Sequence, residues 1–264
     1  MNLLRGEAVR LLSTRLPLWA LVAAVASGAG LTGLLALIGP ENATPPLPGI
    51  DTDQGVGFVV GLSGLTLFLP ALIGTIAITS EFRHRTIGAT FLAAPRRGRL
   101  LAAKLGIFVL LGLGYGVAMA LSAGLALLGA AALRGATLGV TAGTLGIMLT
   151  QLALAAAVYT VLGVAIGALA RHQLLAIGIV VGYFYLLEPV LMLVPGANLV
   201  YPYLPGGATA ALMDFTLLTD TLAEQVPLAA SVLVAPVVGA ALLGAYALLG
   251  SLAAVLVPLQ RDLA

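Results

Sequence analysis

Residues 143–194 read GTLGIMLTQLALAAAVYTVLGVAIGALARHQLLAIGIVVGYFYLLEPVLMLV. Two long apolar runs, Gly143–Ala170 and Leu174–Val194, are separated by only the three residues Arg-His-Gln. A helix needs about 20 apolar residues to cross the hydrocarbon core of a bilayer, and each run reaches that length. Arg171 and His172 therefore mark a tight turn between two antiparallel membrane-spanning helices.

The rest of the sequence is equally apolar. Hydrophobic residues make up 61% of the 264 positions, and the mean hydropathy is +1.13. A soluble domain of this size cannot bury so many apolar side chains in one core. We therefore expect an all-α integral membrane protein, with residues 1–264 forming one transmembrane domain of six spans. The four further runs of spanning length are residues 16–38, 56–79, 105–133 and 228–257.

The basic residues predict how the spans are oriented, because cytoplasmic loops retain positive charge. With the N-terminus inside, all but one of the twelve basic residues lie inside, and the exception is Arg134. Most acidic residues fall in or beside outer loops, including Glu188, which we expect at the outer interface of the fifth span. The first apolar run is too long for a cleaved signal peptide. We expect it to be retained, with both termini in the cytoplasm.

Two segments outside the spans carry their own patterns. In residues 1–15, Leu4, Leu11 and Leu12 share one side of a helix, whereas Arg5 and Glu7 lie elsewhere. This pattern is typical of an interfacial elbow helix on the inner membrane surface, although a charged flank that anchors the first span explains it equally well. The outer loop, residues 195–227, is too long for a turn. Within it, residues 208–215 are expected to form a short helix, as a structural cap or as a gate.

Several classes of chemistry are excluded. The chain has no cysteine, which rules out disulfides and thiol catalysis. His84 and His172 are far apart and lie among arginines, so we expect no metal site. The only lysine, Lys104, does not stand in a phosphate-binding loop motif. Nucleic acid is a poor partner at a net charge of +2. We therefore expect no enzymatic activity and no cofactor in this chain.

Residues 80–104, SEFRHRTIGATFLAAPRRGRLLAAK, join the second span to the third and hold six of the twelve basic residues. The tendency of cytoplasmic loops to retain positive charge is enough to explain these basic residues. However, Phe82, Ile87 and Phe91 also give the segment an apolar side, which predicts an amphipathic helix. Pro95 separates this helix from the next one. Such a helix either lies on membrane lipid or docks into a groove of a partner.

The same stretch resembles the first cytoplasmic loop of the type-2 family of ATP-binding-cassette exporter permeases. Two other segments are similar to that family. RGEAVRLLSTRLPLWAL at residues 5–21 is similar to its elbow, and YLPGGATAAL at residues 203–212 is similar to its last outer loop. The positions that match the loop signature are Glu81, Thr86, Thr90, Pro95, Arg96, Arg97 and Lys104.

The resemblance implies the permease subunit of an ATP-driven exporter in a bacterial cytoplasmic membrane. The loop at residues 80–98 would be the coupling helix, seated in a cleft of a separate cytoplasmic ATPase subunit that binds ATP and Mg. Two ATPase copies and a second permease, either another copy or a sister chain, would complete the transporter. The implied contact residues are Glu81, Arg83, Thr86, Ile87, Thr90, Phe91 and Pro95.

The resemblance also implies a path for the cargo, because protomers of this family face each other mainly through spans 2 and 5. An aromatic, uncharged lining suits an amphipathic or hydrophobic cargo, such as a drug, a lipid or a peptide, better than an ion or a free sugar. Aromatic side chains of membrane helices also commonly face lipid or protein. The residues that spans 2 and 5 offer are Phe58, Thr66, Phe68, Tyr183, Phe184, Tyr185 and Met192.

Two other classes of function stay open. One is an ATPase-independent membrane carrier or a toxin-immunity membrane protein, which predicts no partner at the 80–98 loop. The other is a structural subunit paired with a sister permease. The identity of the cargo is not determined by these patterns, and export as the direction rests on the family alone. The glycine spacings do not assign a dimer face either, since packing within the chain and chance account for most of them. The Gly-x-x-x-Gly pairs are Gly57/Gly61, Gly112/Gly116, Gly163/Gly167 and Gly178/Gly182.

Overall fold

The structure, a computed structural model, describes residues 3–83, 97–216, 219–220 and 232–260. Six helical segments in this part of the chain are long and apolar enough to cross a membrane. The expected all-α fold with six spans is therefore present, and the protein is a multi-pass membrane protein. The six spans are residues 16–38, 53–80, 103–134, 142–170, 173–193 and 236–256.

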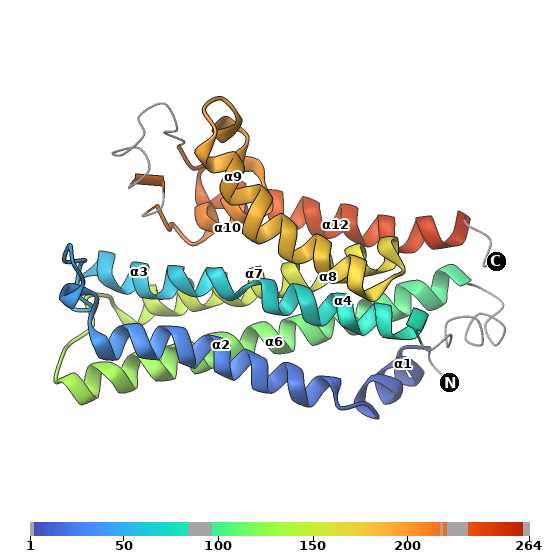
Figure 1. Ribbon diagram of the computed structural model, residues 1–264. Coiled ribbons are helices and arrows are strands. Elements are labelled where there is room, and N and C mark those ends of the chain that lie inside the picture. The colour runs from blue at the N-terminus through green and yellow to red at the C-terminus, as the bar shows by residue number, and fades with distance from the viewer. Residues whose placement is uncertain (1–2, 84–96, 217–218, 221–231, 261–264) are drawn as a thin grey trace.

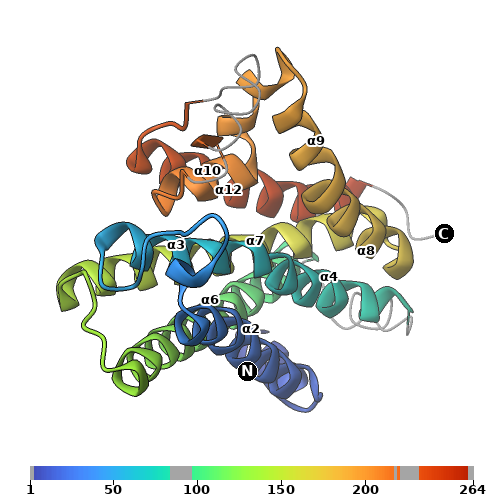
Figure 2. The ribbon, with the colours of Figure 1, turned by 60° about the vertical axis from the view of Figure 1, so that its left-hand side comes forward.

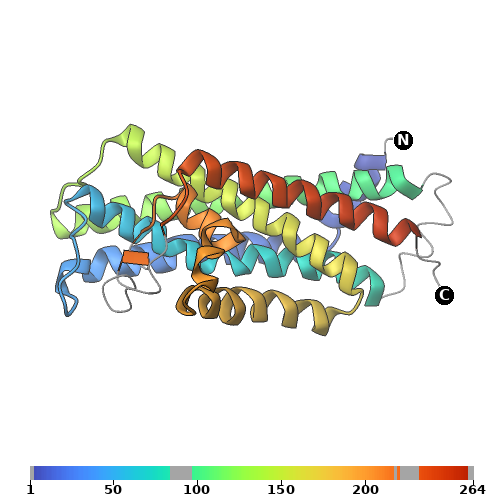
Figure 3. The same ribbon diagram turned by 90° about the horizontal axis from the view of Figure 1, so that it is seen from above.

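The spans are built from helices that run side by side (Figures 1 and 3). The fourth span, α7, lies at the centre. In Figure 2, α2 and α6 lie on one side of α7, whereas α9, α10 and α12 lie on the other. The helices are α1 (Leu3–Leu12), α2 (Leu16–Ile38), α3 (Asp53–Leu62), α4 (Phe68–Arg83), α6 (Arg97–Arg134), α7 (Ala142–Ala170), α8 (Gln173–Gly182), α9 (Glu188–Leu193), α10 (Pro205–Leu212) and α12 (Pro236–Gln260).

The α7 helix is the most buried of the six spans, and its small residues explain why. At Gly163, an added β-carbon would collide with the backbone carbonyl of Ala71 in α4. At Gly116 of α6, it would collide with the carbonyl of Ala153 in α7. Small residues let helix backbones approach closely, which is the main source of packing energy between helices in lipid. Two of the Gly-x-x-x-Gly pairs thus serve contacts within the chain.

The α4–α7 contact also includes a polar bond. The buried hydroxyl of Thr75 lies 2.9 Å from the carbonyl oxygen of Ala71 and 3.0 Å from that of Gly163. Only the second of these acceptors belongs to α7. A hydrogen bond between helices adds roughly 0.6 kcal/mol in a membrane protein. The bond fixes the register of the two helices at the point where their backbones are closest.

The turn between α7 and α8 lies where the sequence predicts it. The α7 helix ends at Ala170, and Arg171 follows with a left-handed φ of 55°. The side chain of His172 then caps α8 by accepting a hydrogen bond from the Leu175 amide at 3.4 Å. A left-handed residue ends the first helix and a polar cap begins the second. Two residues therefore suffice to reverse the chain.

Several boundaries differ from the expected ones. The last span begins at Pro236, not at residue 228: residues 232–235 are not helical, and residues 228–231 lie outside the described part. Proline is favoured in the first turn of a helix, where its missing amide costs nothing. The same preference places the start of α10 at Pro205, three residues before the expected start at residue 208. This short outer helix ends at Leu212 and packs against α12.

The N-terminal helix is present as α1, and its acidic and leucine side chains lie in different surroundings. Glu7 is buried, whereas Leu12 is 71% exposed. Glu7 and Leu11 stand four residues apart and so share one helix face. That face is turned toward α6, where the Glu7 carboxylate meets the ammonium group of Lys104 at 2.8 Å.

Arg134, the basic residue expected outside, ends α6 at the opposite end of the bundle from α1 (Figure 1). Its guanidinium donates a hydrogen bond to the Ala36 carbonyl in the last turn of α2 at 2.9 Å and pairs with Glu41. A backbone hydrogen bond, together with the Arg134 pair, holds the pKa of Glu41 below its ordinary value. Arg134 thus satisfies a carbonyl that the end of α2 leaves without a partner.

The packing of α7 predicts a contrast between two glycines of the same sequence pattern. Gly163→Ala places a methyl group against the α4 backbone and should lower the free energy of unfolding by about 1–3 kcal/mol. Gly178→Ala in α8 meets nothing within 4 Å and should leave that free energy unchanged or raise it slightly. Reversible unfolding in mixed detergent micelles, followed by circular dichroism, measures both. Equal stability of the two variants would contradict the packing described.

Candidate functional site

The predicted contact loop lies between α4 and α6. Of its seven contact residues, Thr86, Ile87, Thr90, Phe91 and Pro95 lie outside the described part of the chain. Glu81 belongs to the last turn of α4. Arg83 is exposed, and its guanidinium donates a hydrogen bond to the Gln173 side-chain oxygen at 3.4 Å, at the start of α8. The coupling helix itself therefore stays a prediction.

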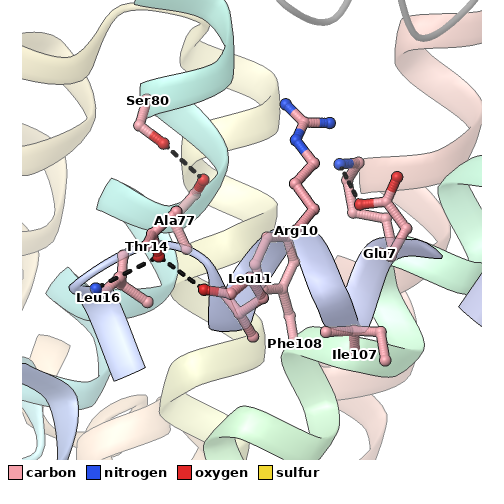
Figure 4. Close-up of a pocket in the computed structure, with 10 residues that line it drawn as sticks. Glu7, Arg10, Leu11, Thr14, Leu16, Ala77, Ser80, Ile107 and Phe108 are labelled. Atoms are coloured by element: carbon pink, nitrogen blue, oxygen red, sulfur yellow. Dashed lines mark hydrogen bonds and ion pairs between the residues drawn. The ribbon is translucent and has the colours of Figure 1, made fainter. Parts of the chain in front are cut away.

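The two helix ends that flank the loop lie at one end of the bundle. The C-terminal end of α4, the start of α6, α1 and the last turn of α12 are all found there (Figure 1). A pocket of about 370 Å³ opens at this end between α1 and the spans. Figure 4 shows Glu7, Arg10 and Leu11 of α1 beside Ala77 of α4 and Phe108 of α6. The elbow helix thus packs directly beside the helices that carry the loop.

The second region of interest is a cavity of about 200 Å³ about halfway along the bundle, here called the aromatic cavity. It lies between spans 2 and 5 and is closed by α7 and the segment that contains α10. Four of the seven predicted path residues line it. These four are Phe68, Phe184, Tyr185 and Met192.

The other three path residues do not line this cavity. Phe58 packs against Phe215, with ring centroids 6.4 Å apart, and faces a neighbouring hollow. The Thr66 hydroxyl donates to the Ser63 carbonyl at 2.8 Å within its own segment. The ring of Tyr183 stands edge-on to that of Phe184, with centroids 5.0 Å apart.

Both spans that flank the cavity are irregular there. Ser63–Thr66 form a tightened 3-10 turn between α3 and α4, and Tyr183–Leu187 form a π-helical turn between α8 and α9. A π turn adds a residue to one helical turn and is frequent at functional sites. The Tyr185 hydroxyl donates to the Leu65 carbonyl at 3.3 Å, which joins the two irregular turns. Sequence reasoning expected uninterrupted helices at both places.

The π turn places consecutive aromatic rings against different neighbours. Phe184 stacks on Tyr159 of α7, with ring centroids 4.9 Å apart and an interplanar angle of 30°. Tyr185 meets Phe68 edge to face, with centroids 5.0 Å apart and an angle of 74°. Both are favourable aromatic geometries, worth about 0.5–1.5 kcal/mol beyond the buried area. The cavity therefore has preformed aromatic walls.

Glu188, in the first turn of α9, also lines the cavity. The prediction of an outer-interface carboxylate was wrong, since Glu188 is only 4% exposed. Its Oε1 accepts a hydrogen bond from the Gly206 amide at 2.5 Å, and the Gly207 amide provides a second backbone bond. A β-carbon on Gly206 would lie 2.7 Å from Oε2, so the carboxyl group would have to move to make room for a larger residue.

The chain segment that covers Glu188 explains its burial. After α9 the chain folds back through Tyr201 and Pro205 into α10, whose first amides point at the carboxyl group. A helix N-terminus favours a negative group. Burial, together with the nearby Glu188 charge, raises the pKa of Tyr201 to about 12, so this phenol keeps its proton at physiological pH. Glu188 was expected at the interface, whereas Tyr159 and Phe215 had no signal in the sequence.

Neither a family model nor a curated protein matches the chain. The class of protein therefore follows from the fold alone, as a multi-pass α-helical membrane protein with six spans. Within the described part of the chain, no group of three or more His, Cys, Asp or Glu residues is placed to hold a metal ion.

The ion pair between α1 and α6 predicts a measurable coupling. The side chains of Lys104 and Glu7 are only 3% and 10% exposed, and removing one partner of a buried pair costs about 3–5 kcal/mol. Glu7→Gln and Lys104→Met should each destabilise the protein. The double variant should lose less than the sum of the two, with a coupling free energy of about 1–3 kcal/mol in reversible unfolding.

The more exposed pair of Glu41 and Arg134 provides the control for this cycle. Its side chains are 40% and 24% exposed, and exposed pairs typically contribute less than about 1 kcal/mol. The cycle Glu41→Gln and Arg134→Met should therefore show the smaller coupling. A larger coupling at this pair than at Glu7 and Lys104 would overturn the assignment of the α1–α6 pair as a buried contact.

Proposed function

We propose that this chain is the permease subunit of an ATP-driven exporter, which moves an amphipathic or hydrophobic molecule across a bacterial cytoplasmic membrane. The observation that carries the proposal is the stretch at residues 80–104. It resembles the loop signature of exporter permeases, and it connects α4 to α6, whose adjoining ends lie at the end of the bundle where α1 lies. The distribution of basic residues favours a cytoplasmic position for that end, where an ATPase subunit would bind.

The length of α6 supports a mechanical role for this loop. The helix has 38 residues and is therefore about 57 Å long, whereas the hydrocarbon core is about 30 Å thick. The helix begins at Arg97, close to the loop, and continues without a break into the span. A displacement of the loop is therefore passed to a rigid helix rather than absorbed by a flexible linker.

The contacts of α6 extend this connection into the bundle. The helix packs along both α2 and α7, and Lys104 ties its base to Glu7 of α1. A partner moves the spans only if its contacts with the loop differ between two states of the transporter. Closure of an ATPase dimer on ATP provides such a difference. The chain has no phosphate-binding loop of its own, so the energy would come from the separate subunit.

The aromatic cavity supports the transport part of the proposal. It lies between spans 2 and 5, about halfway along the bundle, and its walls are largely apolar. Sites of this kind, with a few polar groups among aromatic side chains, take amphipathic small molecules. A permease requires a part that receives the energy and a cavity that holds the cargo, and the chain offers a candidate for each.

A photo-cross-linking experiment tests the proposal. A photoreactive amino acid at Phe91 should capture, in native membranes, a cytoplasmic protein that carries a phosphate-binding loop, which mass spectrometry identifies. The matched control is the same amino acid at Leu133, which is 81% exposed at the other end of the bundle and should capture no such protein. Capture of only lipid or of the chain itself from Phe91 would reject the coupling loop and favour an ATPase-independent carrier.

A further inference from the structure

A carboxyl group lines the aromatic cavity. Among the described residues that line it, Glu188 alone has an ionisable acid or base of ordinary pKa near or below 7. Within the described part of the chain, no Lys, Arg or His forms an ion pair with this carboxyl group. The amides of Gly206 and Gly207 orient it, but neutral donors do not cancel a charge. The cavity therefore lacks a counter-charge within the described residues.

A carboxylate in the interior of a membrane protein is costly, and such residues commonly face a substrate or ion pathway. Glu188 stands five residues before the end of α9 at Leu193, or about 8 Å along the helix axis. It therefore lies below the outer end of the span, inside the protein. A cation bound in the cavity would offset the cost of burying the carboxylate.

The aromatic walls determine which kind of cation fits. The rings of Phe68, Tyr159, Phe184 and Tyr185 offer π surfaces, and a cation near such a face gains about 0.5–2 kcal/mol. A metal ion would need several oxygen ligands to replace its water, and the lining provides a single carboxylate. An organic ammonium group is weakly hydrated and needs no such ligand set, so it matches both the charge and the walls.

The size of the cavity limits the cation further. About 200 Å³ is below the usual range of roughly 300–1,000 Å³ for sites that enclose drug-sized molecules. The space takes an ammonium head with one ring or a branched alkyl body. Tyr185 is 48% exposed and stands at the open side, so the remainder of a longer molecule would extend past it.

We infer that the aromatic cavity binds a monovalent organic cation, a quaternary or protonated amine with an aromatic or branched apolar body. This inference rests on the proposed function, because it names the chemical class of the cargo. It also changes the expectation from the sequence, which described the lining as uncharged. Glu188 attracts the ammonium group, and the aromatic rings select an organic cation over a metal ion.

A binding experiment on the full chain tests this. The protein is placed in nanodiscs of neutral phosphatidylcholine, and the probe is radiolabelled benzyltrimethylammonium, with empty nanodiscs as the blank. Glu188→Gln keeps an oxygen that accepts from Gly206 but removes the charge. It should raise the Kd about tenfold or more. Asp51→Asn, which removes an exposed carboxylate from the loop between α2 and α3, should leave the Kd unchanged.

A neutral competitor separates charge from shape. Neopentylbenzene has the shape of the probe without its charge. It should compete poorly in the wild-type protein and about equally with the probe in Glu188→Gln. Should Glu188→Gln not fold, Phe184→Leu provides the second variant, because it removes a ring face and leaves the charge. It should weaken binding of the cation several-fold and leave competition by the neutral compound unchanged.

Three outcomes would overturn the inference: no saturable binding to folded wild-type protein, wild-type affinity in folded Glu188→Gln, or equal competition by the neutral compound in the wild type. Glu188 would then serve only to cap α10. The proposed function is tested independently, because ATPase capture from Phe91 does not involve the cavity. Capture of an ATPase without binding of the cation would reject the proposed cargo class but support the permease. Binding of the cation without capture of an ATPase would point to an ATPase-independent cation carrier.

Discussion

The close contact of α7 with the backbones of α4 and α6 is the constraint on which the rest of the structure depends. Lipid tails are as apolar as leucine, so helices in a bilayer gain little from hiding apolar side chains and must gain from tight packing instead. Gly163 and Gly116 allow that packing, and Thr75 fixes its register. Because α7 also contacts α8 and α12, all the spans except α2 lie directly on it.

The aromatic cavity lies where this tight packing ends. Tyr159 is a large residue on a helix whose buried face is otherwise mainly small, and it holds Phe184 and the π turn away from α7. The tightened turn at Ser63–Thr66 and the π turn at Tyr183–Leu187 face each other across the gap. Cavities in close-packed interiors are costly, so a preformed one lined by a buried carboxylate is consistent with a binding site.

Much of the fold could be predicted from the sequence because membrane spans depend on length and hydropathy. The six spans and the turn at Arg171 and His172 follow from these two properties alone. The faces of the helices could not be predicted, because a helix that is apolar all round has no polar side to mark its orientation. The burial of Glu7 shows a related limit. Its face is determined by Lys104, which lies far away in the sequence.

The candidate site was predicted only in part for a similar reason. Phe68, Phe184, Tyr185 and Met192 belong to the two spans that the family resemblance singled out. Glu188 was expected at the interface, since nothing in the sequence shows that the chain after α9 folds back to cover it. The Gly206 amide, which comes from that returning segment, donates a hydrogen bond to the Glu188 carboxyl group. The proposed function thus depends on a cavity within the membrane spans and on a loop that a cytoplasmic ATPase subunit can reach.

The side of the membrane on which the 80–98 loop lies is the property that tests the proposed function most directly. Because the chain has no cysteine, single introduced cysteines can measure it. Ala43→Cys places a thiol in the exposed loop between α2 and α3, and Thr90→Cys places one in the coupling loop. A membrane-impermeant maleimide added to intact cells should label Ala43→Cys and leave Thr90→Cys unlabelled until the membrane is permeabilised. Labelling of Thr90→Cys in intact cells, with Ala43→Cys protected, would contradict the account, because no cytoplasmic ATPase could then reach the loop.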